Sequence, residues 1–320
     1  MIAEIPAPEN VQLSVPPSTC VPAIKLRGVT KSYNGTPALR DVSFTVKQGE
    51  IMGFLGPNGA GKTTAIRILL DLIRADHGCV NILGLDCRRD SKAVRRLVGY
   101  MPGELKLYED MTGRQVIDYF ASLRPGSVEP SYVTYLIGQL EVDVAKRVGS
   151  YSRGNKQKLG LLLALMHKPR VLLLDEPTSG LDPLMQEAVV ALLEEATKGG
   201  ATVFFSSHVL SEVERMCHRV AFLRNGRLVA VEDVAELKGR SLHIVEVTFR
   251  EAPPAGAFDL PGVREVERHG ETVHLEVREH LDAALKAIAR YEVRDLRTEQ
   301  PSLEQIFLTY YEGASHEARA

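Results

Sequence analysis

The stretch GPNGAGKT, residues 56–63, has the residue types and spacing needed to bind a nucleotide's phosphates. It satisfies the pattern G-x-x-x-x-G-K-[ST] and lies between a short apolar run, "IMGFL", and a helical pattern, "AIRILLDLI". Glycines let successive backbone N–H groups surround phosphate oxygens, and the following helix adds its positive N-terminal end. Lys62 would supply positive charge to the outer phosphates, and the Thr63 hydroxyl would ligate Mg²⁺. The alternative is an ordinary tight turn. The residues expected to contact the nucleotide here are Gly56, Pro57, Asn58, Gly59, Ala60, Gly61, Lys62, Thr63 and Thr64.

A second stretch, "VLLLDE" (171–176), offers two adjacent carboxylates at the end of an apolar run. Strand alternation would point the two side chains in different directions. Asp175 would hold the metal's water shell and remain ionised, and Glu176 would polarise the attacking water as general base. Alone, a strand ending in Asp-Glu could be no more than the start of a loop. Beside a phosphate loop, it predicts hydrolysis of a nucleotide.

The elements that must position these residues alternate between strand and helix. Two strand patterns near the N-terminus are separated by the turn-rich "YNGTP", and Asn225-Gly226 predicts a tight hairpin turn. This alternation predicts an α/β fold with a mainly parallel sheet covered on both faces. The strands are expected at 23–29, 39–46, 51–55, 171–176, 201–207 and in the hairpin 220–230, and the later helices at 88–97, 112–124, 131–141, 159–168 and 183–198.

Two segments outside this core differ in character. Residues 1–22 hold five prolines and are expected to form a flexible tail, with a binding peptide as the alternative. From about residue 241, period-two alternation in "HIVEVTF" and "VHLEV" predicts a small separate α+β domain, 241–320, for which a ferredoxin-like arrangement is one candidate. Leu281, Leu285 and Ile288 would share one helical face, and "PSLEQIF" fits a capping box that opens a last helix.

Composition restricts the class of protein. The chain has 320 residues, 44% of them hydrophobic, and a formal net charge of −2, which gives no reason to expect nucleic-acid binding. No apolar run is long enough to cross a bilayer, and the N-terminus lacks a signal-peptide pattern. The four cysteines have no metal-site spacing and favour free thiols in a reducing cytosol.

These motifs, in this order, resemble the nucleotide-binding subunits of ATP-binding cassette (ABC) transporters over about residues 24–235. "SGLD" (179–182) resembles the family's D-loop, which puts Asp182 near the nucleotide. His208 matches the switch histidine that contacts the γ-phosphate, and Tyr33 matches the aromatic residue that stacks on adenine. Alone, either residue would be interpreted as packing or capping. The resemblance implies a P-loop NTPase cassette, 23–240, with an antiparallel β subdomain and a helical subdomain at about 104–168.

The segment "YSRGNKQ" (151–157) resembles the family's signature loop LSGGQ, with Ser152 and Gly154 at matching positions. In the family this loop closes on the γ-phosphate of ATP held by a second subunit, so two chains form two sites. Arg153 departs from the pattern and is compatible with it if its φ is negative. A charged, solvated loop is the alternative. A second departure is Gly103, which stands where the family has a glutamine that senses Mg²⁺; the adjacent Glu104 is a candidate replacement.

The resemblance implies an ATP- and Mg²⁺-dependent ATPase that acts as a homodimer, or with another cassette, on a separate integral membrane permease. The expected place is the cytoplasm, at the inner face of the membrane. The tail ending "PSLEQIFLTYY" looks most like bacterial exporters of drugs, antibiotics or other hydrophobic compounds. Leu105, Leu107 and Tyr108 are expected to line the permease's docking groove, with internal packing as the alternative. Two other functions stay open: a non-transport ABC ATPase acting on ribosomes or nucleic acid, and a binding-only regulatory module.

Overall fold

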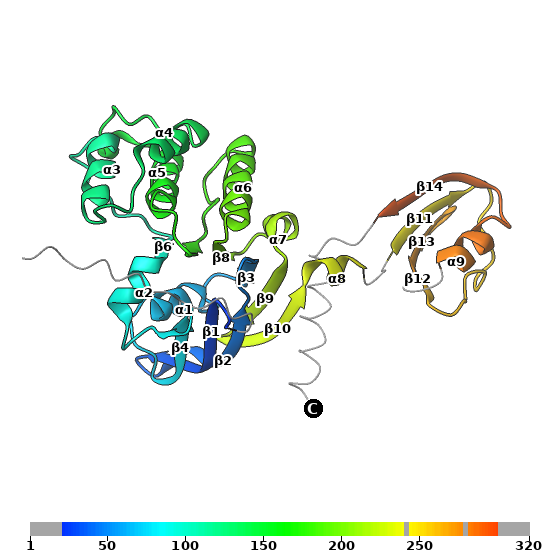
Figure 1. Ribbon diagram of the computed structural model, residues 1–320. Helices are drawn as coiled ribbons and strands as arrows, with labels where there is room; N and C mark the ends of the chain where they lie inside the picture. The colour runs from blue at the N-terminus through cyan, green and yellow to red at the C-terminus, as the bar shows by residue number, and fades with distance from the viewer. Residues whose placement is uncertain (1–20, 240–242, 278–280, 300–320) are drawn as a thin grey trace, which may run out of the picture.

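The structure is a computed structural model that describes residues 21–239, 243–277 and 281–299. Its central feature is a six-stranded sheet in the order β10-β9-β3-β8-β7-β6 (Figure 1). All neighbouring strands run parallel except β10, which pairs antiparallel with β9. The predicted mainly parallel α/β sheet is therefore confirmed. The strands are β3 (Ile51–Leu55), β6 (Val98–Met101), β7 (Val171–Asp175), β8 (Thr202–Ser207), β9 (Arg219–Arg224) and β10 (Arg227–Asp233).

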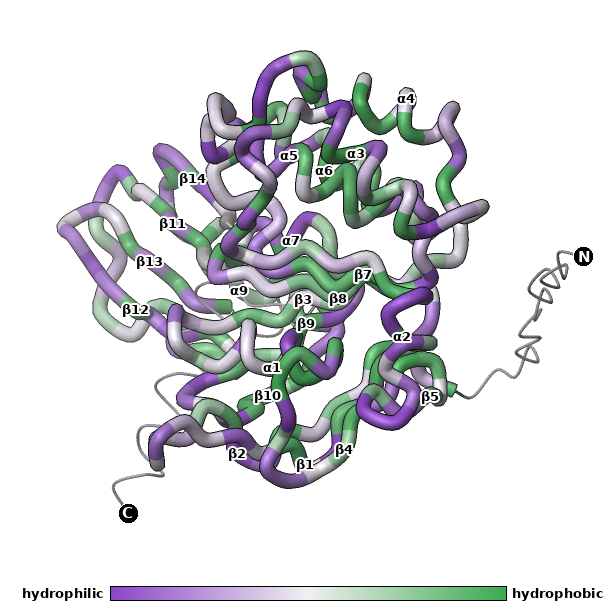
Figure 2. Tube along the Cα trace, turned by 90° about the vertical axis from the view of Figure 1, so that its left-hand side faces the viewer, coloured by the Kyte–Doolittle hydropathy of each residue, from purple (hydrophilic) through white to green (hydrophobic). Residues whose placement is uncertain are grey.

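The two faces of this sheet are buried in different hydrophobic clusters. On β7, Leu172 and Leu174 join the cluster of the later helices, whereas Val171 and Leu173 join the cluster that contains the first helix. Burial on both faces explains why β3 and most of β7 are apolar, as Figure 2 shows along these strands. The helices are α1 (Lys62–Leu69), α2 (Ser91–Leu97), α3 (Gly113–Ser122), α4 (Pro130–Gln139), α5 (Arg153–Leu165), α6 (Pro183–Lys198), α7 (Leu210–Met216) and α8 (Val234–Gly239).

A second sheet is antiparallel, in the order β2-β1-β4-β5. Phe44 of this sheet packs against Phe54 and Phe204 of the central sheet, with ring centroids 5.3–5.7 Å apart within the trio. Aromatic pairs of this kind add about 0.5–1.5 kcal/mol each beyond the area they bury. The trio therefore fixes the two sheets against each other. The strands are β1 (Ile24–Tyr33), β2 (Thr36–Val46), β4 (His77–Ile82) and β5 (Leu85–Asp86).

Most sequence-based boundaries are correct within a few residues, and α5 is the main exception. It begins at Arg153, well before the predicted start at 159, because the Ser152 hydroxyl accepts from Asn155 N and caps the helix. The Asn225-Gly226 turn has the two positive φ angles, 49° and 75°, that its sequence predicted. Strands β4, β5 and β6 and helix α7 were not predicted from the sequence.

The C-terminal part contains a separate antiparallel sheet, in the order β12-β13-β11-β14, with its own core. Its elements follow the ferredoxin-like series, except that no helix lies between β11 and β12 in the described residues 250–262. The predicted helical face was wrong for Leu285, which is exposed, whereas Ala284, Ala287 and Ile288 are buried. The elements are β11 (His243–Phe249), β12 (Val263–His269), β13 (Thr272–Val277), α9 (Leu281–Ile288) and β14 (Val293–Glu299).

Two sequence-based predictions concern residues that the structure does not describe. The proline-rich tail lies outside the described residues except for its last two positions, and the final capped helix lies wholly outside them. The division of the chain at about residue 240 stays a prediction. In the part of the chain that is described, no helix is long and apolar enough to cross a membrane.

Candidate functional site: a nucleotide-hydrolysis centre

The phosphate loop connects β3 to α1, as the motif requires. Gly61 immediately precedes the helix and has φ +110°, and a Cβ at this position would lie 2.3 Å from the Ala38 carbonyl oxygen. Gly56 is equally restricted, because its Cβ would lie 2.3 Å from the Leu223 carbonyl oxygen. The loop therefore needs glycine at both positions for its backbone to take this path.

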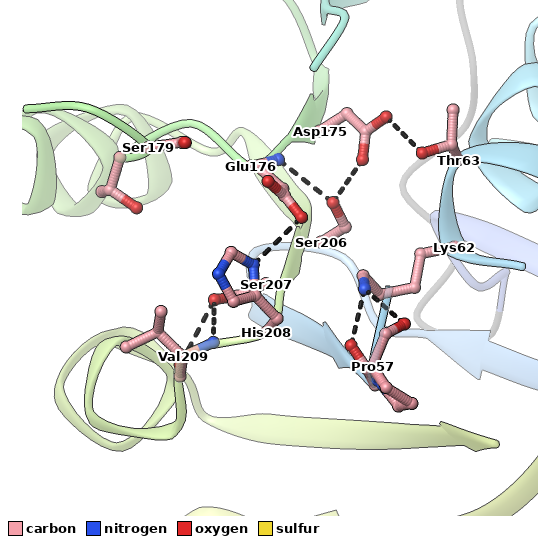
Figure 3. Close-up of polar contacts among 12 residues, drawn as sticks. Pro57, Lys62, Thr63, Asp175, Glu176, Ser179, Ser206, Ser207, His208 and Val209 are labelled. Carbon is pink, nitrogen blue, oxygen red and sulfur yellow. Dashed lines mark hydrogen bonds and ion pairs between the residues drawn. The ribbon is translucent and has the colours of Figure 1, made fainter. Parts of the chain in front are cut away.

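Lys62 lies almost fully buried under this loop, with 6% of its surface exposed. Its ammonium donates to the Gly56 and Pro57 carbonyl oxygens at 2.6 and 3.1 Å (Figure 3). Burial lowers the Lys62 pKa, and the nearby carboxylates of Glu176 and Asp175 oppose this shift. A phosphate would therefore offer the buried ammonium an anionic partner where it now has neutral carbonyl groups.

Asp175 connects the phosphate loop to two strands. One carboxylate oxygen accepts from the Thr63 hydroxyl at 2.7 Å, and the other accepts from the Ser206 hydroxyl at 2.5 Å. The side chain of Asp175 is 3% exposed, and Ser206 is fully buried at the end of β8. Sequence reasoning missed Ser206, although its place at the end of the strand beside "VLLLDE" was a usable signal.

A hydroxyl and a carboxylate this close fit a magnesium ion, because Mg²⁺ prefers oxygen ligands and completes its shell with phosphates and water. No group of three or more His, Cys, Asp or Glu among the described residues is arranged to hold a metal alone. The ion would thus depend on the nucleotide, with Thr63 and Asp175 as the protein's side of the site.

Glu176 points away from Asp175 and toward His208 (Figure 3), as strand alternation predicted. One of its carboxylate oxygens lies 3.0 Å from His208 Nδ1. Its backbone is left-handed, with φ +52°, which costs a non-glycine residue about 1–2 kcal/mol. The Glu176 N–H donates to the Ser206 hydroxyl at 3.1 Å and to the Ser206 carbonyl at 3.2 Å, and these bonds help to hold that conformation. Nothing in the sequence indicated the strained backbone.

Glu212 of α7 connects the two loops that carry these residues. Its carboxylate accepts from the Thr178 hydroxyl after β7 and from the Ser207 hydroxyl at the end of β8, at 2.5 and 2.7 Å. The Ser207 hydroxyl also accepts from Val209 N at 2.9 Å, so the residues on both sides of His208 are hydrogen-bonded to each other. Glu212 therefore fixes the position of His208 relative to Glu176. It was missed because a carboxylate within a short amphipathic helix gives no recognisable pattern.

The proposed signature and D-loop residues lie at helix starts. Ser152 caps α5, and the Asp182 carboxylate accepts from Met185 N at 3.0 Å and caps α6. Arg153 is the first residue of α5 and has a negative φ. This is the condition under which an arginine is compatible with the signature-loop pattern. A Cβ on Gly154 would lie 2.9 Å from the Gly180 carbonyl oxygen, so this glycine allows the two loops to touch.

The remaining predicted residues lie at the edges of this arrangement. Tyr33, at the end of β1, is 45% exposed, and the Lys31 ammonium lies 5.6 Å from the centroid of its ring. Gly103 lies beside Asp175, and a Cβ at position 103 would be 3.3 Å from Asp175 Oδ2. Glu104 is exposed. Pro57, Asn58, Gly59, Ala60 and Thr64 belong to the loop and the first turn of α1.

Comparison with known proteins agrees with this geometry. The ABC transporter family matches residues 39–179, which include the phosphate loop and β7. A Bacillus subtilis relative described as an uncharacterized ABC transporter ATP-binding protein, YhcH, is 38% identical over 216 residues, which cover 67% of this chain and 70% of the relative. The chain belongs to the ABC transporter ATP-binding proteins. It is therefore a member of a family of ATP-hydrolysing cassettes, and the predicted resemblance and cassette fold are confirmed.

Other matches extend beyond the residues covered by that family. Residues 233–311 match a family described as the C-terminal domain of DrrA1-3-like ATP-binding proteins. A Rhizobium meliloti protein described as Nod factor export ATP-binding protein I is 31% identical over 306 residues, covering 93% of this chain and 90% of the relative. A Mycobacterium tuberculosis protein described as a fluoroquinolones export ATP-binding protein is 34% identical, covering 78% and 88%.

Solved structures support the same cassette fold. The structure of an ATP-binding subunit of an ABC transporter matches with a TM-score of 0.62 and 27% identity, covering 68% of this chain and 92% of that one. A dimeric ATP-binding cassette bound to ADP and phosphate matches in fold with a TM-score of 0.61 and 23% identity, covering 66% and 98%.

Proposed function

We propose that this cassette hydrolyses ATP to drive a separate membrane permease that exports drugs, antibiotics or other hydrophobic compounds. The observation that carries the proposal is the pairing of Thr63 with Asp175 and of Glu176 with His208 beside one phosphate loop. The first pair suits a nucleotide-bound Mg²⁺, and the second suits activation of water at the γ-phosphate. Export is supported by the names of the Rhizobium and Mycobacterium relatives and by the DrrA-like tail.

The proposed reaction uses this chain's residues in fixed roles. Loop N–H groups and Lys62 hold the phosphates, while Tyr33 stacks on adenine. Glu176 accepts a proton from the attacking water, and His208 orients that carboxylate and donates toward the γ-phosphate. When bound, Mg²⁺ would neutralise developing charge on the phosphates. Thr63 and Asp175 are the residues that would hold it.

Two copies are needed for the complete proposed site, either of this chain or of this chain and another cassette. Ser152 and Gly154 would contact the γ-phosphate bound by the other copy, with Asp182 nearby. The dimeric form of the fold relative bound to ADP and phosphate supports this arrangement. Closing two copies around ATP and reopening them after hydrolysis would transmit work to the permease.

The permease docking groove, proposed near residues 103–111, would include a cavity that borders the first part of this segment and is not lined by Tyr108. This cavity of about 330 Å³ is lined by apolar residues, including Leu105 and Leu107, and by Arg95, Lys106 and Arg124. Within the described part of the chain, none of these three cations has a carboxylate within 4 Å. We therefore expect the docked segment to present apolar and acidic side chains, at the cytoplasmic face of the membrane.

The predicted docking residues do not share one environment. Tyr108 is 52% exposed and packs edge-on against Tyr119, whereas Leu105 and Leu107 pack partly against the core. Tyr108→Asp is therefore the sharper test, because Leu107→Asp would also destabilise the cassette. Replacing Tyr108 should weaken capture of the permease without changing the free energy of unfolding by more than about 0.5 kcal/mol.

The function is tested by affinity purification of the Glu176→Gln variant with ATP from native membranes, followed by mass spectrometry. Recovery of a multi-span membrane protein, reduced by Tyr108→Asp, is the expected result. Recovery of ribosomal or DNA-bound proteins without a permease would contradict the transport role and favour the non-transport alternative. No finding favours that alternative or a binding-only module, and the intact Glu176 and His208 oppose the latter.

A further inference from the structure

Helix α5 holds the loop after β7 of its own chain, which we call the 176–182 loop, at several points. Gln157 is 4% exposed, and its side-chain amide donates to the Glu176 carbonyl oxygen at 2.8 Å. One turn earlier, the Arg153 guanidinium donates to the Ser179 hydroxyl at 2.9 Å. The start of the helix also touches this loop directly, where Gly154 meets the Gly180 carbonyl group.

The carbonyl that Gln157 holds belongs to the strained residue. Glu176 is left-handed, and its carbonyl oxygen accepts from Gln157 Nε2 and from Ser179 N, at 2.8 and 3.2 Å. A strained conformation persists only where the surroundings fix it. These two donors lie on the carbonyl side of Glu176 and the Ser206 bonds lie on its N–H side, so both peptide groups are fixed. The direction of the Glu176 carboxylate therefore depends on the position of α5.

Arg153 adds a contact that glycine, the residue of the LSGGQ pattern, could not make. Its side chain lies over Gly180, with Cδ 3.5 Å from the position of a Cβ there. No carboxylate in the described part of the chain lies within 4 Å of its guanidinium, and its side-chain hydrogen bond goes to the Ser179 hydroxyl. The charged group is thus directed to the 176–182 loop rather than to an acidic neighbour.

We infer that Arg153 and Gln157 are positioning residues that make each chain's Glu176 respond to its own signature loop. This inference rests on the proposed function, in which the signature loop binds the nucleotide of the other copy. When that nucleotide fixes the start of α5, Gln157 fixes the Glu176 carbonyl and Arg153 fixes Ser179. Occupation of one site therefore prepares the other for hydrolysis, and turnover should be cooperative in ATP concentration.

The test compares the wild-type chain with Arg153→Ala, Arg153→Lys and Gln157→Met in two measurements. The first is amide hydrogen exchange of the 176–182 loop without nucleotide; the second is ATP hydrolysis against ATP concentration. Gln186→Met is the matched control, because Gln186 donates to the Leu181 carbonyl of the same loop at 3.2 Å, but from α6. Arg153→Ala, Gln157→Met and Gln186→Met each remove a hydrogen bond to this loop, whereas Arg153→Lys keeps a donor at the same position.

We expect Arg153→Ala and Gln157→Met to speed exchange in the loop and to lower kcat by about two- to tenfold, the range for one lost hydrogen bond. Their Hill coefficients should fall toward one, while ATP affinity stays within twofold. Arg153→Lys keeps a donor and should retain the wild-type Hill coefficient. Gln186→Met should retain it as well.

Several results would overturn the inference. Unchanged exchange and an unchanged Hill coefficient in both variants would do so, as would an equal loss of cooperativity in Gln186→Met. Ser179→Ala distinguishes positioning from a second explanation, in which the charge of Arg153 acts directly on the phosphate bound by the other copy. A full effect of Arg153→Ala with none from Ser179→Ala would establish that explanation and contradict positioning. A wild-type chain without ATPase activity would contradict the proposed function, and exchange would still decide whether α5 holds the loop.

Discussion

Ser206→Ala should weaken the use of Mg²⁺ more than it weakens the fold. The Ser206 hydroxyl is fully buried and makes two hydrogen bonds, donating to Asp175 and accepting from Glu176 N. Removing it leaves one buried carboxylate oxygen without that donor, which should cost about 1–3 kcal/mol in the free energy of unfolding. Loss of a group that orients a metal ligand typically lowers metal affinity about 10- to 100-fold.

The assay is ATP hydrolysis at fixed ATP with increasing Mg²⁺, beside urea unfolding of the same samples. Thr202→Val is the matched control. Thr202 lies at the opposite end of β8, is 1% exposed, and accepts from Gly49 N at 3.0 Å. Both variants should lose stability, but only Ser206→Ala should need more Mg²⁺ for half-maximal activity. Equal Mg²⁺ dependence in wild type and Ser206→Ala would refute this reasoning, and so would an equal shift in Thr202→Val.

Three further changes test other parts of the structure. Burial holds the His167 pKa at about 4, so the unfolded chain takes up a proton between pH 6.5 and pH 4 that the folded chain does not. The free energy of unfolding should therefore fall by up to about 3 kcal/mol as pH drops through that window, and His167→Leu should remove this part in urea titrations. Glu212→Ala frees both loops beside His208, so kcat should fall about tenfold in phosphate-release assays with ATP affinity within twofold; an unchanged kcat would exclude its positioning role. Gly61→Ala should abolish nucleotide binding in a fluorescence titration, because its Cβ meets the Ala38 carbonyl, whereas Gly49→Ala has open space around it and should cost only about 1 kcal/mol.

The central sheet and the phosphate loop were predictable because their signals are local. An apolar run, a glycine pattern and a following helix are all contiguous in the sequence, and the carboxylates of Asp175 and Glu176 end a strand. Strand β5 carries a weaker pattern, because it lies at a sheet edge and has only two residues. Strand β4 pairs with β1, which is distant in sequence, and β5 pairs in turn with β4.

The parts of the site that sequence could not supply are those set by contacts between elements. Ser206 and Glu212 are ordinary residues until the fold brings them to Asp175 and Ser207. The left-handed backbone of Glu176 is equally invisible, because glutamate has no preference for it. Asp182 and Ser152 were predicted as nucleotide contacts and in this structure cap helices; the two roles are compatible, and the first stays a prediction.

The most direct measurement follows phosphate release and molecular mass, by light scattering, for the wild-type chain and Glu176→Gln with Mg²⁺ and ATP. We predict that the wild type hydrolyses ATP. Glu176→Gln should bind ATP, show almost no turnover and accumulate at twice the 35.3 kDa mass of the chain. Normal turnover by Glu176→Gln would contradict Glu176 as the base, and a variant that stays monomeric with ATP bound would contradict the shared two-chain site.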